Sequence, residues 1–165
     1  MSEKSIATVM APPAPHFVGD GFRVHNFIPG RLDMTRFSPF LMMDYNSKYY
    51  FPPSEKPKGV DVHPHRGFET VTIAYKGKVA HHDSFGNSGV IEEGDVQWMT
   101  AGSGILHQEM PKGDTNGRMH GFQLWANLPS SLKMTTPRYQ DVVSKEIPEI
   151  TDDDGTIVRV VCGEF

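Results

Sequence analysis

Short runs of β-branched and aromatic residues, separated by glycine-containing turns, fill the middle of this chain. The runs are FETVTIAY (68–75), KVAHHDS (78–84), VIEE (90–93), VQWMTA (96–101), ILHQEM (105–110) and MHGFQLWANLP (119–129). These residue types favour strands, and the glycines between them favour tight turns. No run has the periodicity of an amphipathic helix. The sequence therefore predicts an all-β protein.

A meander of this length exposes strand edges unless it closes into a barrel or a sandwich. The segment before it, residues 25–53, contains short apolar runs. These runs are interrupted by Pro29, Pro39, Pro52 and Pro53. Because proline is found mainly in edge strands and turns, we expect this segment to form edge strands and loops that cover the barrel. Near the other end, TIVRVV (156–161) predicts a final strand after a solvated acidic turn.

Length and charge narrow the function classes. A chain of 165 residues is long enough for one domain with a hydrophobic core and too short for two ordinary ones. The formal net charge of -4 leaves no basic face for a phosphate backbone, so direct nucleic-acid binding is not expected. The single cysteine, Cys162, permits no intrachain disulfide and fits a small core position. With no signal peptide or membrane-spanning run, we expect a cytoplasmic protein, with the nucleus also open in a eukaryote.

Two histidine-containing pairs stand at i and i+2 on predicted strands. HPHRGFETV begins with His63 and His65, and GILHQEM contains His107 and Glu109. Side chains at i and i+2 of a strand point to the same face, so each pair can share one target. A single His-X-His pair is more often a packing or surface feature than a ligand pair. Two pairs on neighbouring strands would aim three imidazoles and one carboxylate at one point, a donor set that suits a metal ion.

The remaining histidines have weaker signals. His81 and His82 alternate faces, so at most one looks inward, and we expect a surface or rim position for them. His120 opens the run HGFQLW and is a candidate for the wall of the cavity beside the metal. A hydrogen-bonded strand histidine is an equal alternative. The alternation through Gln123 and Trp125 is typical of ordinary sheet packing.

Three segments carry a resemblance to a known family. HPHRGFETV, GDVQWMTAGSGILHQEMP and HGFQLWANLP resemble the pirin family of the cupin superfamily, in the family's order. The resemblance extends from about residue 22 to residue 161 and implies a jelly-roll-type cupin β-barrel. It also implies one mononuclear divalent metal, usually Fe(II), held by His63, His65, His107 and Glu109. These donors also accept Mn, Co, Ni, Cu or Zn. The segment HPHRGFE is similar to the general cupin pattern as well, which makes Glu69 a reserve ligand or a partner of the ligands.

The resemblance also sets an expected organisation. We expect an N-terminal arm at 1–21, a pirin-type cupin domain at 22–135, and a C-terminal extension at 136–165 that forms a linker and the start of a second cupin domain. Pirins usually have two such domains. A first barrel without its partner would expose apolar surface or an unpaired strand edge, so we expect a homodimer at raised concentration.

Two classes of function follow from the resemblance. The first is an iron-dependent oxidoreductase of the quercetin 2,3-dioxygenase type, with a flavonol and dioxygen as substrates and Glu109 as the group that accepts the substrate's hydroxyl proton. The second is a non-enzymatic, iron- or redox-responsive regulator that binds a protein partner, either a transcription cofactor or a regulator of a metabolic enzyme. Partner binding that tracks the oxidation state of iron, without turnover, would favour the second.

Overall fold

The computed structural model describes residues 5–30, 33–52, 54–113 and 115–164. Pro53 and the first four residues of the expected arm lie outside these ranges. Within them, most of the chain is β-strand, and helix is limited to three short 3-10 segments, Met34–Arg36, Ser130–Leu132 and Ser144–Glu146. No helix in this part of the chain is long and apolar enough to cross a membrane. The all-β prediction is confirmed.

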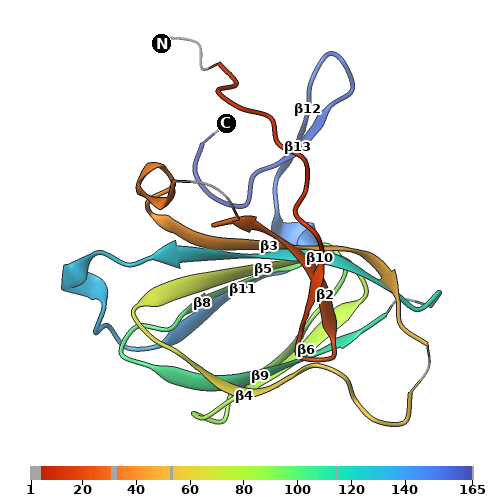
Figure 1. The fold of residues 1–165 in the computed structure, drawn as a ribbon, viewed down its shortest axis with the longest axis vertical. Helices are drawn as coiled ribbons and strands as arrows, with labels where there is room; N and C mark the ends of the chain where they lie inside the picture. The colour runs from red at the N-terminus through yellow and green to blue at the C-terminus, as the bar shows by residue number, and fades with distance from the viewer. Residues whose placement is uncertain (1–4, 31–32, 53, 114, 165) are drawn as a thin grey trace.

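Two sheets face each other and enclose the interior (Figure 1). The seven-stranded sheet has the order β1-β2-β3-β10-β5-β8-β11. Its strands are β1 (His16–Val18), β2 (Phe22–Ile28), β3 (Phe40–Tyr50), β5 (Phe68–Lys76), β8 (Val96–Thr100), β10 (Arg118–Asn127) and β11 (Arg138–Val142). The four-stranded sheet has the order β4-β9-β6-β7. Its strands are β4 (Val60–His65), β6 (Lys78–Asp83), β7 (Ser88–Ile91) and β9 (Ile105–Lys112). The antiparallel sandwich is a cupin β-barrel.

The predicted strands and turns of the meander match β5 to β10. Gly77 connects β5 to β6 with a φ of 82°, and Gly94 precedes β8 with a φ of 85°. Only glycine adopts such a left-handed backbone readily, which explains why glycine occupies these turns. Gly77 also lies so close to the carbonyl oxygen of Lys112 that an added Cβ would be 2.6 Å from it.

The N-terminal prediction is wrong for one element. Residues 40–50 form β3, an 11-residue strand that pairs with β2 on one side and β10 on the other. It is therefore an interior strand of the sheet and not an edge cover. The reason is that Pro39 and Pro52 flank the strand and do not interrupt it, so every residue of the strand keeps a backbone N–H for pairing.

The core lies mainly between the sheets. Met99 and Val79 are completely buried there, and Ala74 and Met119 pack with Val79. A second apolar cluster covers the opposite face of the seven-stranded sheet, where Ile147 of the C-terminal segment packs with β5 and β8. Strand β11, which the sequence analysis assigned to the extension 136–165, pairs with β8, so the barrel sheet continues past residue 135. Where a second domain would begin stays a prediction.

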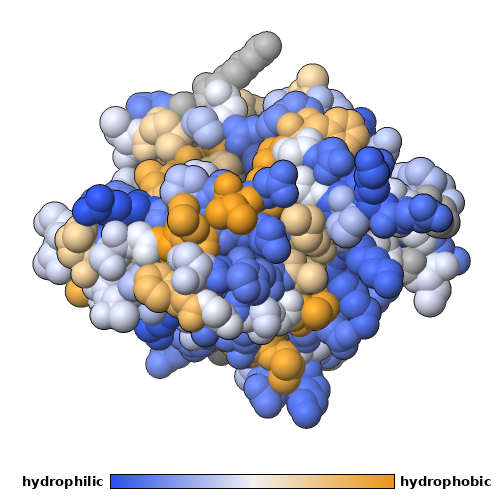
Figure 2. Space-filling model, turned by 90° about the horizontal axis from the view of Figure 1, so that it is seen from below, coloured by the Kyte–Doolittle hydropathy of each residue, from blue (hydrophilic) through white to orange (hydrophobic). Residues whose placement is uncertain are grey.

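The outer surfaces differ from this core. A small hairpin of β12 (Glu149–Thr151) and β13 (Ile157–Arg159) projects from one side of the barrel (Figure 1). Figure 2 views the molecule from the side of β4 and β9. Small groups of hydrophobic residues lie there among hydrophilic ones. The outward residues Val62, Val90 and Leu106 of this sheet are exposed. Cys162 is also exposed, so its predicted core position is wrong.

Candidate metal centre

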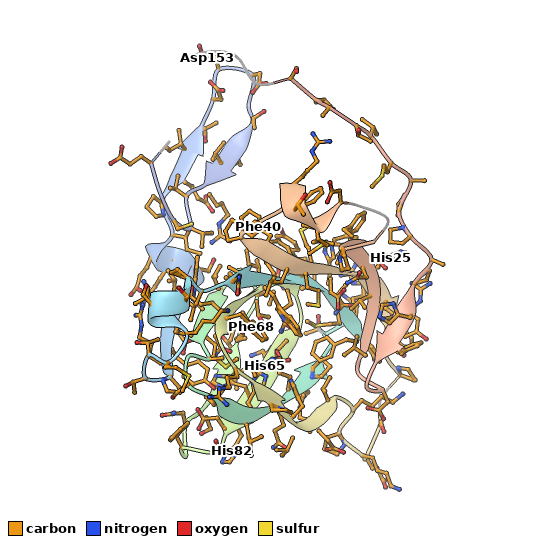
Figure 3. The ribbon with its side chains drawn as sticks, turned by 60° about the vertical axis from the view of Figure 1, so that its left-hand side comes forward. His25, Phe40, His65, Phe68, His82 and Asp153 are labelled. Atoms are coloured by element: carbon orange, nitrogen blue, oxygen red, sulfur yellow. The ribbon has the colours of Figure 1, made fainter. Side chains whose placement is uncertain are left out.

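Three histidines meet inside the barrel on the four-stranded sheet. His63 and His65 are on β4, His107 is on β9, and the register places His63 directly opposite His107. Each offers one ring nitrogen, and the three nitrogens lie within 4.8 Å of one another. His65 and His107 are buried, and Figure 3 shows His65 in the interior beside Phe68. The two strands thus bring the three predicted histidines to one place.

A hydrogen bond to the backbone leaves the other ring nitrogen of His63 with a free lone pair. His63 Nδ1 lies 2.7 Å from the carbonyl oxygen of Asp61, which can only accept, so Nδ1 carries the hydrogen and Nε2 is bare. That Nε2 lies 3.1 Å from Nε2 of His65. Two nitrogens on neighbouring positions of one ion, each at about 2.1 Å, are separated by roughly 3.0 to 3.4 Å. The spacing fits shared coordination.

His107 supplies an independent observation. Both of its ring nitrogens are buried and have no hydrogen-bond partner among the described residues. A buried polar atom without a partner is costly, and its presence calls for an explanation such as an ion or water. A cation between the three rings would satisfy Nε2 of His107. The donor set and the orphaned nitrogen therefore fit a metal ion.

Burial keeps the imidazoles of His65 and His107 neutral. Desolvation, together with the nearby His63, lowers the pKa of His65 from 6.5 to about 4. Desolvation and the neighbouring histidines lower the pKa of His107 to about 3. A neutral imidazole is the form that binds metals, so both rings are ready to do so at pH 7.

Glu109 stands beside the histidine cluster but does not complete it in this conformation. Its Oε2 lies 4.0 Å from Nε2 of His107. Glu109 is nevertheless not in the group of described residues whose ligand atoms all lie within 4.8 Å of one another, which contains only the three histidines. Burial raises the pKa of its carboxyl group, and a hydrogen bond from Gln123 to Oε1 at 3.0 Å opposes that rise. The carboxylate is thus placed to reach the cluster with one oxygen.

Aromatic rings line the other side of the cluster. The rings of Trp125 and Phe68 each meet His65 edge-on, with centroids 5.2 Å away. The two rings also pack against each other at 4.5 Å. Both come from the seven-stranded sheet, so they form an apolar wall opposite the strands that carry the histidine cluster.

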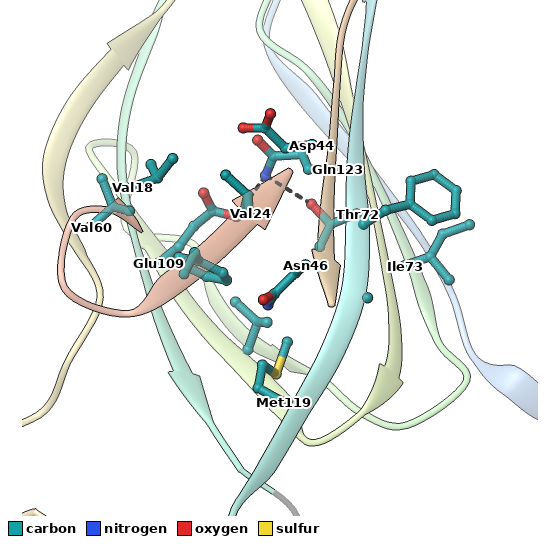
Figure 4. A pocket seen from close by; sticks show the side chains of 14 residues that line it. Val18, Val24, Asp44, Asn46, Val60, Thr72, Ile73, Glu109, Met119 and Gln123 are labelled. Carbon is teal, nitrogen blue, oxygen red and sulfur yellow. Dashed lines mark hydrogen bonds between the residues drawn. The ribbon is translucent and has the colours of Figure 1, made fainter. Parts of the chain in front are cut away.

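A cavity opens next to Glu109 (Figure 4). Apolar side chains such as Val24 and Met119 line most of it, and Asn46 and Asp44 add polar groups. The amide of Asn46 is buried, and neither its oxygen nor its nitrogen has a hydrogen-bond partner among the described residues. The cavity has room for a few water molecules.

The structure separates the other sequence candidates from the centre. Glu69 accepts a hydrogen bond from Thr100 at 2.7 Å and is not part of the histidine cluster. His120 forms a 2.9 Å hydrogen bond with Tyr45 and packs against Tyr75. It is therefore the hydrogen-bonded strand histidine of the second alternative and does not line the cavity. The predicted surface or rim position holds for exposed His82 and is wrong for His81.

His81 is 7% exposed and points into the barrel. Its Nε2 lies 2.7 Å from the amide nitrogen of Gln97, and its ring packs against Tyr139. The ring fits because the facing residue is Gly89, where a Cβ would be 2.7 Å from Nε2. Alternation alone cannot tell which of two adjacent histidines faces inward. The glycine across the strand pair was the available signal.

Comparison with known proteins agrees with this architecture. The Pirin family model matches residues 21–126. A Pseudomonas aeruginosa protein provisionally named quercetin 2,3-dioxygenase is 49% identical over 154 residues, which are 91% of this chain and 54% of that protein. A crystal structure of quercetin 2,3-dioxygenase from Acinetobacter baumannii has a TM-score of 0.85 at 48% identity, over 93% of this chain and 55% of that one.

A bacterial pirin from Escherichia coli, solved in complex with nickel(II), has a TM-score of 0.60 at 26% identity and covers 79% of this chain and 56% of that one. The chain spans about half the length of the curated relatives that it matches. The family match, the relatives and the fold agree with the resemblance found in the sequence. The chain therefore belongs to the pirin family.

Proposed function

We propose that this chain binds one divalent metal ion and acts in the 2,3-dioxygenation of a flavonol or a similar enol. The observation that carries the proposal is the cluster of three histidine ring nitrogens within 4.8 Å of one another, one of them from His107, whose two buried nitrogens have no hydrogen-bond partner among the described residues. The names of two relatives, one of them a solved structure, support quercetin as the type of substrate.

His63, His65, His107 and Glu109 would hold the ion. Iron(II) is the proposed ion, and nickel(II) in the Escherichia coli relative shows that a pirin accepts another divalent metal. Four protein ligands leave positions open on an ion that prefers six. A redox-active ion bound there supplies Lewis acidity and electron exchange with dioxygen.

Glu109 is the proposed proton acceptor. Because burial raises the pKa of its carboxyl group, the carboxylate is a stronger base than that of an exposed glutamate. It can therefore accept the proton of an enol hydroxyl near neutral pH and hold it while the ring is opened. Gln123 donates to Oε1, so Oε2 is the oxygen that faces the histidine cluster.

The aromatic wall serves the same reaction. Phe68 and Trp125 offer flat apolar surface beside His65, which suits an aromatic substrate and excludes water from the cluster. Excluding water preserves a reactive enolate from reprotonation by solvent. The chain's own residues thus provide binding, a base and a dry surface.

The test begins with protein freed of metal and loaded with Fe(II) under anaerobic conditions. Addition of quercetin and aerated buffer should cause oxygen uptake and loss of flavonol absorbance. Metal analysis should show less bound iron in His63→Ala and Glu109→Ala, whereas His82→Gln, on an exposed side chain of β6, should retain it. Oxygen uptake that does not exceed that of the metal-free protein would refute the proposed activity.

A further inference from the structure

Gln123 on β10 makes three side-chain hydrogen bonds. One reaches the carboxylate of Glu109 on the other sheet, and two join side chains of its own sheet. Its Nε2 donates to Oε1 of Glu109 at 3.0 Å and to the hydroxyl oxygen of Thr72 at 3.1 Å. Its Oε1 accepts from the indole Nε1 of Trp125 at 3.0 Å. Figure 4 shows Gln123 between Thr72 and Glu109 at the edge of the cavity. Both amide hydrogens and the amide oxygen have partners.

The partners fix which way the amide faces. An indole N–H can only donate, so the atom of Gln123 that faces Trp125 has to be the oxygen. The NH₂ group is consequently turned toward Glu109. With Trp125 in place, rotating the amide by half a turn would bring two donors together and two acceptors together. The amide is therefore held in one orientation.

This orientation gives the two carboxylate oxygens of Glu109 different partners. Oε1 is occupied by the Gln123 amide, and Oε2 is the oxygen that lies 4.0 Å from Nε2 of His107. Glu109 itself is 6% exposed, so little of its carboxylate faces bulk solvent. Among the described residues, Gln123 is the side chain that donates a hydrogen bond to the carboxylate of Glu109.

Trp125 joins this arrangement to the histidines. The same indole that orients Gln123 packs edge-on against His65 and against Phe68. One side of the centre is thus supported by ring packing, and the other by the amide that the ring orients. Displacing the indole would affect both sides together.

We propose that Gln123 is a positioning residue that retains Oε1 of Glu109 and leaves Oε2 as the one oxygen offered to the metal ion, with Trp125 fixing the direction of the amide. This inference rests on the metal centre put forward in the proposed function. It predicts a carboxylate that binds through one oxygen. It also assigns a role to two residues whose alternation is otherwise typical of sheet packing.

The experiment measures the affinity of the full chain for Mn²⁺ by competition with a coloured chelator. Gln123→Leu removes the amide at similar volume and should weaken binding by about 10- to 100-fold, the usual effect of losing a residue that orients a ligand. Trp125→Phe keeps a ring against His65 but removes Nε1, and should give a smaller loss. His82→Gln, on the exposed face of β6, is the control and should bind Mn²⁺ as tightly as wild type.

A second readout does not depend on whether the Gln123 and Trp125 variants fold. In the infrared difference spectrum between Mn²⁺-loaded wild type and Glu109→Gln, a carboxylate bound through one oxygen shows a wider separation of its two stretching bands than a free carboxylate. A narrower separation, the signature of binding through both oxygens, overturns the inference. Folded Gln123→Leu with wild-type affinity for Mn²⁺ overturns it as well.

The outcomes separate this inference from the metal centre itself. If Glu109→Ala binds Mn²⁺ as tightly as wild type, the four-residue centre is wrong, and the role of Gln123 is wrong with it. If Glu109→Ala loses affinity while Gln123→Leu does not, the centre stands and only the role of Gln123 is rejected.

Discussion

Acid should destabilise the metal-free protein through two buried histidines of the centre. In the folded chain the pKa of His65 is about 4 and that of His107 is about 3, because burial disfavours the charged rings. In the unfolded chain both return to 6.5. Between these values the unfolded state binds more protons than the folded state, so stability is full above pH 6.5 and is lost as the pH falls.

The expected size follows from these pKa values. At pH 5 each unfolded imidazole is about 1.5 pH units below its ordinary pKa while the folded rings remain neutral, which costs about 2 kcal/mol per histidine at about 1.4 kcal/mol per unit. The two together should lower the free energy of unfolding by about 4 kcal/mol between pH 7 and pH 5. That is a large part of the roughly 5 to 15 kcal/mol by which domains are stable. The raised pKa of Glu109 acts in the opposite direction, so variants are needed to isolate the histidines.

Urea unfolding after chelator treatment, at pH 7 and pH 5, measures this difference. His107→Gln should lose about 2 kcal/mol less than wild type between the two pH values, because one proton uptake site has been removed. His82→Gln is the control, because His82 is exposed on the outer face of β6, and it should lose as much as wild type. If His107→Gln loses the same free energy as wild type, the assignment of acid sensitivity to buried, neutral His107 is refuted.

Three further outcomes are expected. Met99→Ala should lower the free energy of unfolding by about 2 to 5 kcal/mol in urea titrations, because Met99 is completely buried, whereas Met134→Ala, at an exposed position, should change it little. Gly77→Ala should be less stable than Gly86→Ala in thermal melts, because both glycines have positive φ but only Gly77 has backbone within 3 Å of the added Cβ. Light scattering should detect a homodimer at raised concentration, consistent with exposed apolar residues such as Leu106, and a monomer at every concentration would contradict this.

The sequence was sufficient where the signal is local. Strand alternation placed His63 with His65 and His107 with Glu109, and the structure has each pair on the predicted strand. Glycine turns located the meander from β5 to β10 for the same reason, since positive φ is a property of single residues.

What the sequence did not reveal depends on contacts between strands far apart in the chain. Whether His81 or His82 faces inward depends on Gly89 and Gln97, which lie on other strands. The role of Gln123 depends on Glu109 from the opposite sheet, although a glutamine at an inward position between apolar residues was a usable signal. His120 and Gly121 flank a shift in register, which local periodicity cannot anticipate.

The centre is divided between the two sheets of the barrel. All four proposed ligands are on β4 and β9 of the four-stranded sheet, whereas Gln123, Trp125 and Phe68, which orient or enclose them, are on β10 and β5 of the seven-stranded sheet. The alignment of the proposed ligands therefore depends on how the two sheets pack against each other. Since interiors are close-packed and transmit small displacements, the apolar core between the sheets supports the geometry of the metal centre as well as the stability of the fold.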